Sequence, residues 1–178
     1  MTESRSPDPV TEAAAYQRHL LRLLGEDDPA EAQAATLSAW PALVDEAAEL
    51  LGVRPEPAEW SVLECLGHAV DAEIVYSGRY RWTIAHDEPE LIGYDQDLWV
   101  GRLGHEEAEP SELLGVFEAL RRANLALWAR SSAEERARVG MHRERGPESF
   151  DLSFRLIAGH DRFHLAQARR ALPAVRDR

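Results

Sequence analysis

Apolar residues recur along most of this chain at intervals of three and four, which is the spacing of one buried face of an α-helix. One such pattern begins at residue 13, where Tyr16, Leu20, Leu23 and Leu24 fall on the same side of a predicted helix. A longer stripe near the C-terminus consists of Phe150, Phe154, Ile157, His160, His164, Ala168 and Ala171. No segment shows the alternation of apolar and polar residues that is typical of a β-strand.

The positions of proline and glycine divide these patterns into separate predicted helices and loops. Helices are predicted over residues 13–24, 59–85, 110–130 and 149–172, with one or two shorter helices in residues 30–51 that are interrupted near Pro41. Residues 86–109 are predicted to be a loop with one helical turn, and residues 140–149 a Gly/Pro loop. Long helices joined in this way predict an all-α protein, a four-helix bundle. We expect a flexible tail over residues 1–10 and a single domain over residues 11–174.

Composition narrows the classes of partner. The 178 residues carry a net charge of −12, which argues against nucleic acid or an anionic membrane as the main partner. The single cysteine, Cys65, excludes a disulfide scaffold and a cysteine-rich metal site, and it indicates the cytoplasm. The N-terminal MTESRSPDPV lacks the apolar centre of a signal peptide, and no apolar run approaches the length of a membrane span. We therefore expect a cytoplasmic protein.

Two positions of the C-terminal stripe are histidines. His160 and His164 are four residues apart, so both rings can face one point on the same side of a helix. They stand where core residues belong, and an unpartnered polar group in a core costs on the order of 1–3 kcal/mol. Two explanations stay open: core histidines with hydrogen-bond partners, or two ligands of one metal ion. The H-D-x-x-H pattern does not indicate a zinc protease, because Asp161 is shorter than the glutamate of that motif.

A metal ion would need a third ligand, since two histidines alone hold a divalent ion weakly. The other histidines are His19, His68, His86, His105 and His142. His68 lies within a predicted helix, with Glu64 one turn before it and Asp71 one turn after it, so the three share a face. Either this face is solvated, or it forms a pocket wall in which His68 binds the ion and a carboxylate orients its second ring nitrogen. The spacing alone does not decide between the two.

Four segments resemble motifs of the DinB/YfiT-like superfamily. Residues 60–73, W-S-x-x-E-x-x-G-H-x-x-D-x-E, are similar to the second-helix motif of that family. Residues 158–167, A-G-H-D-R-F-H-L-x-Q, are similar to its fourth-helix motif. Between them, G-Y-D-Q-D-x-W (residues 93–99) and G-M-H-x-x-R-G (residues 140–146) resemble connecting segments of one bacterial branch.

The resemblance implies a bundle of up-down-down-up topology that is often dimeric. It also implies a divalent metal, commonly nickel or zinc, held by three histidines that correspond here to His68, His160 and His164. The helix predicted over residues 110–130 carries more apolar side chains than one bundle can bury, and these could form a dimer interface. They are Leu113, Leu114, Phe117, Leu120, Leu125, Leu127 and Trp128.

Family members of known activity mostly act on low-molecular-weight thiols, as mycothiol-dependent isomerases and as bacillithiol or mycothiol S-transferases. The resemblance therefore implies a metal-dependent enzyme that joins a thiol to a small electrophile. A metal suits this chemistry, because a coordinated thiol is deprotonated outright and only the thiolate attacks. Two alternatives stay open: a hydrolase whose nucleophile is water activated by the metal, and a metal- or ligand-binding bundle in stress response without turnover.

Further side chains are candidates for roles around the metal. Glu64, Asp71 and Asp161 are candidate catalytic acids or bases for either enzyme. Candidates for binding the thiol or substrate are His142, Trp99 and Arg121. Because the chain is acidic, an anionic substrate would need local cations, and Arg121, Arg122 and Arg145 are the candidates for that role.

Overall fold

The computed structural model describes residues 7–8 and 11–176, so most of the predicted N-terminal tail lies outside the described residues. Its elements, in chain order, are α1 (Ala13–Leu24), α2 (Pro29–Ala47), η1 (Ala48–Leu50), α3 (Val62–Ala85), β1 (Glu90–Leu91), α4 (Gln96–Arg102), η2 (His105–Glu107), α5 (Pro110–Arg130), α6 (Ala133–Ala137), β2 (Val139–His142), β3 (Gly146–Ser149) and α7 (Phe150–Arg176). No helix among the described residues combines the length and apolarity needed to cross a membrane.

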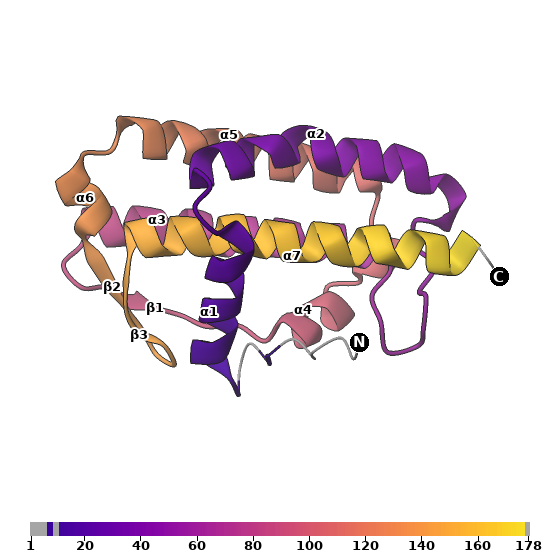
Figure 1. The fold of residues 1–178 in the computed structure, drawn as a ribbon, viewed down its shortest axis with the longest axis horizontal. Coiled ribbons are helices and arrows are strands. Elements are labelled where there is room, and N and C mark those ends of the chain that lie inside the picture. Colours follow the sequence, from indigo (N-terminus) through magenta and orange to yellow (C-terminus); the bar gives the residue numbers. More distant parts are fainter. Residues whose placement is uncertain (1–6, 9–10, 177–178) are drawn as a thin grey trace.

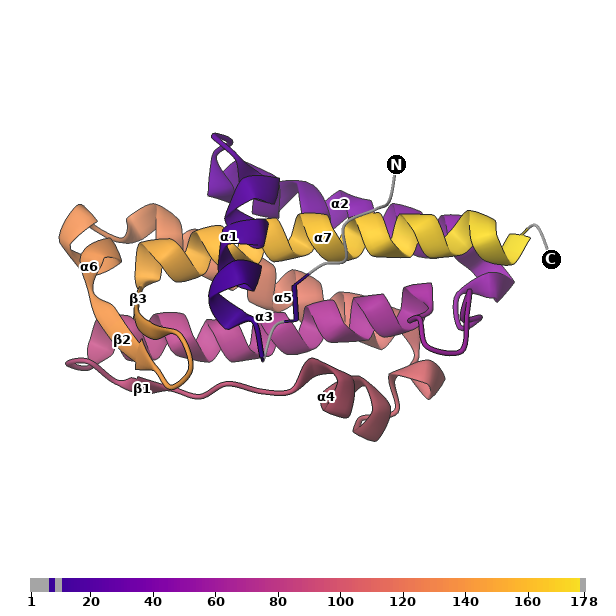
Figure 2. The same cartoon turned by 60° about the horizontal axis from the view of Figure 1, so that its bottom comes forward.

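Helices α2, α3, α5 and α7 form a four-helix bundle. α2 and α7 run in one direction and α3 and α5 in the other, which gives the predicted up-down-down-up order (Figure 1). α3 packs on α5 and α7, and α2 packs on the same two helices from the opposite corner. Because α3 and α5 are parallel neighbours, the chain must travel back along the bundle between them. Residues 86–109 make this return along the outer side of α3 and carry β1, α4 and η2 (Figure 2).

Two helices extend beyond their predicted breaks. α2 continues through Pro41, although a proline inside a helix removes one backbone hydrogen bond and costs about 3 kcal/mol. The flanking Trp40 and Leu43 are buried in the main core, and this packing outweighs the loss. α7 likewise passes Pro173, because Val175 beyond it is also buried in that core. The predicted interruption near Pro41 is therefore wrong.

A small sheet joins two connecting segments that the sequence predicts to be loops. β1 pairs with β2 in parallel, with Leu91 opposite His142, and β2 pairs with β3 as an antiparallel hairpin. The strands are two to four residues long, too short for alternation to be visible in the sequence. The sequence pattern therefore gives no signal of these strands, and the sheet ties residues 90–91 to the hairpin just before α7.

The apolar side of α5 is used inside the bundle. Phe117 and Trp128 are buried in two separate core clusters, against which Leu113, Leu114, Leu125 and Leu127 pack. These residues therefore contribute to the bundle core, the leucines only in part, and the homodimer stays a prediction.

The short helix α1 lies across α7 at a point of direct backbone contact (Figure 1). A Cβ atom on Gly159 would lie 2.1 Å from the carbonyl oxygen of Leu20, so only glycine allows α1 to approach this closely. Gly159 immediately precedes His160, and the contact therefore fixes α7 next to one of the predicted ligands.

Gly159→Ala should lower the free energy of unfolding by about 1–3 kcal/mol, because the added methyl group overlaps the α1 backbone. The control is Gly115→Ala on the exposed side of α5, where a Cβ meets nothing within 4 Å. This change should be neutral or stabilising by up to about 1 kcal/mol, since alanine favours the helix. Urea unfolding followed by circular dichroism measures both variants. Equal stability of the two would contradict the close approach of α1 and α7.

Candidate metal centre

The three predicted ligands come from the antiparallel neighbours α3 and α7. α3 begins with a capping box, in which Ser61 accepts a hydrogen bond from the Glu64 amide and Glu64 accepts one from the Ser61 amide. His68 follows one turn later, fully buried. His160 and His164 project from successive turns of α7 and are also buried. The structure thus brings all three rings together in the core.

The rings converge through their Nε2 atoms. Nε2 of His68 lies 2.8 Å from Nε2 of His160, and one ring nitrogen from each histidine falls within 4.8 Å of those of the other two. Nδ1 of His164 lies 2.9 Å from Oε1 of Gln167, which makes Nδ1 the protonated nitrogen. Its Nε2 is then a buried lone pair, and it has no hydrogen-bond partner among the described residues.

Burial sets the charge of this cluster. It lowers the pKa of His68 and His160 well below 6.5, with a further contribution from the neighbouring imidazoles, and it lowers the pKa of His164 to about 4. All three rings are therefore neutral at pH 7, the state in which imidazole binds a metal. A buried, uncharged, three-nitrogen donor set with an unused lone pair fits a divalent ion such as zinc or nickel.

The sequence matches the family model of the DinB superfamily over residues 29–168. The chain belongs to the DinB superfamily. Among solved structures it is similar to YfiT from Bacillus subtilis, described as "a probable metal-dependent hydrolase with an unusual four-helix bundle topology". That likeness has a TM-score of 0.67 at 16% sequence identity and covers 95% of this chain and 90% of YfiT, and it supports the fold. No curated protein matches the sequence.

Aromatic side chains cover the triad of this DinB-family protein. The Trp60 ring stacks on His164 with centroids 5.8 Å apart, and it lies 5.0 Å from the His68 ring. Tyr94, from the return segment, lies 6.3 Å from His68. Trp99 on α4 contacts Tyr94 at 4.7 Å, which places this predicted substrate-binding residue one ring away from the triad.

The three candidate catalytic carboxylates all have other partners. Glu64 bonds to Ser61 and to Arg54, away from the ligand cluster. Asp71 lies 2.7 Å from Nε2 of His105, whose ring packs so closely on Gly67 that a Cβ there would meet it at 2.4 Å. Neither Glu64 nor Asp71 reaches the Nδ1 atom of His68, which has no hydrogen-bond partner among the described residues. The expected hydrogen bond from a carboxylate to the second ring nitrogen of His68 is therefore not formed.

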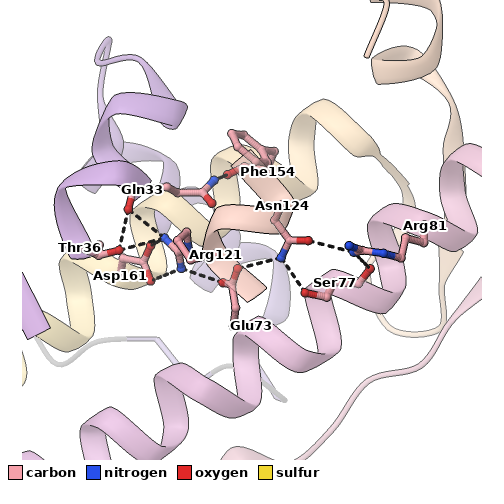
Figure 3. Close-up of polar contacts among 9 residues, drawn as sticks. All are labelled: Gln33, Thr36, Glu73, Ser77, Arg81, Arg121, Asn124, Phe154 and Asp161. Atoms are coloured by element: carbon pink, nitrogen blue, oxygen red, sulfur yellow. Dashed lines mark hydrogen bonds and ion pairs between the residues drawn. The ribbon is translucent and has the colours of Figure 1, made fainter. Parts of the chain in front are cut away.

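The third candidate, Asp161, belongs to a closed polar network with Arg121 (Figure 3). Arg121 is fully buried between Asp161 and Glu73, with nitrogen–oxygen distances of 3.1 and 2.8 Å. Asn124 donates to Glu73 from the other side, and Thr36 adds a hydroxyl contact to Arg121. Burial raises the pKa of Asp161 to about 6, although Arg121 acts in the opposite direction. The network holds α2, α3, α5 and α7 together directly behind His160.

A small cavity lies on the other side of His160. It measures ≈ 50 Å³, and its wall includes Arg79, Arg145, Tyr94 and His160. Arg121, predicted to bind substrate, is not part of this wall. His142 lies behind the wall with its Nε2 3.3 Å from Arg79, and burial together with Arg145 and Arg79 lowers the pKa of His142 to about 4. Arg79 was not among the sequence candidates, because nothing distinguishes it from other helical arginines.

Arg121→Met should reduce the free energy of unfolding by about 3–5 kcal/mol, because it leaves two buried carboxylates without their cation. Its neighbour Arg122 is exposed and forms a surface pair with Glu118, so Arg122→Met should change stability by less than about 1 kcal/mol. Chemical denaturation of the metal-free proteins tests the pair of variants. A stability of Arg121→Met close to that of Arg122→Met would show that the network is not structural.

Proposed function

We propose that this protein is a divalent-metal-dependent enzyme that activates a low-molecular-weight thiol for attack on a small electrophile. The observation that carries the proposal is the triad itself, three buried and neutral imidazoles with no carboxylate in the cluster among the described residues. With only neutral ligands, the full charge of a divalent ion is available to a fourth ligand. A thiol coordinated to such an ion would have its pKa lowered from about 8.5 in water, and it would lose its proton to solvent at neutral pH.

The residues of the chain supply binding and shielding. His68, His160 and His164 would hold the ion, and the hydrogen bond from Nδ1 of His164 to Gln167 leaves its Nε2 free to bind it. Trp60 and Tyr94 cover the rings and limit access of water. The cavity beside His160 supplies space for part of a substrate next to the reacting atoms.

Hydrolysis is the second candidate function, favoured by the description of YfiT as a probable metal-dependent hydrolase. Hydrolysis commonly uses a side chain as general acid or base. Here Glu64, Asp71 and Asp161 are engaged by Arg54, His105 and Arg121, respectively. A divalent ion would lower the pKa of a bound water as well as that of a thiol, but hydrolysis of an ester or amide must also protonate its leaving group, and none of these three carboxylates is free to do so. This difference supports the thiol reaction over hydrolysis.

The test is a panel of reactions with the zinc- or nickel-loaded protein and a chromophoric electrophile. Glutathione, bacillithiol, mycothiol and no thiol are compared, each with and without a chelator. The proposal predicts conjugation that requires both the metal and one specific thiol.

Two results of the panel would contradict the proposal. Turnover of ester or amide substrates without thiol would identify a hydrolase. No turnover of any substrate, with metal still bound, would favour the third function, a metal- or ligand-binding bundle.

A further inference from the structure

The wall of the cavity beside His160 includes a buried cation, Arg79, that forms no ion pair with another described residue. Arg79 is 2% exposed, yet no carboxylate lies within 4.0 Å of its guanidinium among residues 7–8 and 11–176. Arg121, buried to the same degree, has two carboxylate partners, and the cavity residue Arg145 is paired with Glu148 at 2.7 Å. A buried charge that lacks a partner is strongly unfavourable, so the position of Arg79 calls for an anion that the described residues do not supply.

The small sheet fixes this guanidinium in place. One terminal nitrogen of Arg79 donates to the carbonyl oxygen of Ile92 at 2.6 Å, and the same nitrogen lies 3.3 Å from Nε2 of His142. Pairing of β1 with β2 brings the Ile92 carbonyl and the His142 ring together beside Arg79, with Leu91 opposite His142. Tyr76 packs against the guanidinium at 4.8 Å, while the Nε atom has no hydrogen-bond partner among the described residues. Arg79 is thus held rigidly, with donor capacity left over.

The other groups around the cavity do not neutralise Arg79. His142 is uncharged at neutral pH, since its pKa is lowered to about 4 by burial and by the two arginines. Glu148 is bonded to Arg145 and to the hydroxyl of Ser153, and Arg79 also helps to lower its pKa, so one carboxylate faces two arginines. Glu144 lies at the rim with its side chain 44% exposed and its carboxylate against Gly93, and it forms no ion pair with Arg79. One uncompensated positive charge therefore remains inside the cavity wall.

The wall also offers a neutral donor. The Tyr16 hydroxyl is buried without a hydrogen-bond partner among the described residues, and burial raises the pKa of this group, so it stays protonated. A planar carboxylate matches the fork of an arginine and accepts a further hydrogen bond from a hydroxyl. A single water needs roughly 10–15 Å³ of cavity volume, so this cavity of ≈ 50 Å³ can hold a carboxylate with a few attached carbon atoms.

We propose that this cavity binds the carboxylate group of a small substrate, with Arg79 as the anion-binding residue. Because His160 forms part of the same wall, the rest of the molecule extends toward the triad. The extension of the molecule toward the triad rests on the proposed function, whereas binding of its carboxylate to Arg79 does not need the metal. Arg79 would then select carboxylic acids over their neutral analogues.

The experiment compares propionate with propionamide, which have the same shape and differ in charge, by NMR titration at constant ionic strength. The metal-free and the zinc-loaded full chain are both titrated. Propionate should bind at least about tenfold more tightly than propionamide to both forms, because a charge-assisted pair with a buried arginine is lost with the amide. Equal affinity of the acid and the amide would overturn the proposal without the need for any variant.

Variants at position 79 test whether the preference for propionate over propionamide depends on Arg79. Arg79→Gln should abolish the preference for propionate, and Arg79→Lys, which keeps the charge without the fork, should restore part of it. The matched control is Arg130→Gln on the exposed end of α5, which removes the same charge from the surface and should leave the preference intact. An unchanged preference in Arg79→Gln would contradict the assignment. Since the preference is also measured on the metal-free protein, failure here is distinct from failure of the thiol assay.

Discussion

The convergence of three uncharged imidazole rings between α3 and α7 is the feature on which the rest of this structure depends. Burial keeps His68, His160 and His164 neutral, and their Nε2 atoms meet in a space that contains no other polar partner among the described residues. Such an arrangement is unfavourable by itself, because buried polar atoms need hydrogen bonds or a metal. The bundle maintains it by two close contacts at glycines, where His105 packs on Gly67 and α1 packs on Gly159.

The two sides of the triad each contain a buried arginine, and these two arginines differ in whether a carboxylate pairs with them. Behind His160, Arg121 is enclosed by Glu73 and Asp161, and four helices are joined by this network (Figure 3). In front of His160, Arg79 faces a cavity and has no ion-pair partner among the described residues. A closed, charge-satisfied side supports the site, and an open side with unsatisfied charge is suited to a ligand. The same residue type therefore has a structural role on one side and a proposed binding role on the other.

Much of the fold could be predicted from the sequence, because the helical stripes are long and glycine and proline mark most helix ends. His160 and His164 could be paired from their spacing alone. His68 cannot be chosen in this way, since no spacing excludes the four remaining histidines (His19, His86, His105 and His142), and the family motif is needed to select it. The sheet was missed because its strands are very short and β1 pairs with a segment far along the chain. Adjacent Arg121 and Arg122 look alike in sequence, and only packing shows that the first points inward.

The most direct test of the account is a calorimetric titration of the metal-free protein with zinc. The triad predicts one tightly bound ion per chain in the natural protein and in His86→Ala, which removes an exposed histidine far from the cluster in sequence. His68→Ala should lose tight binding, because only the pair on α7 remains. Zinc binding by His68→Ala as tight as that of the natural protein, or no binding by either, would contradict the assignment of these three histidines as a metal centre.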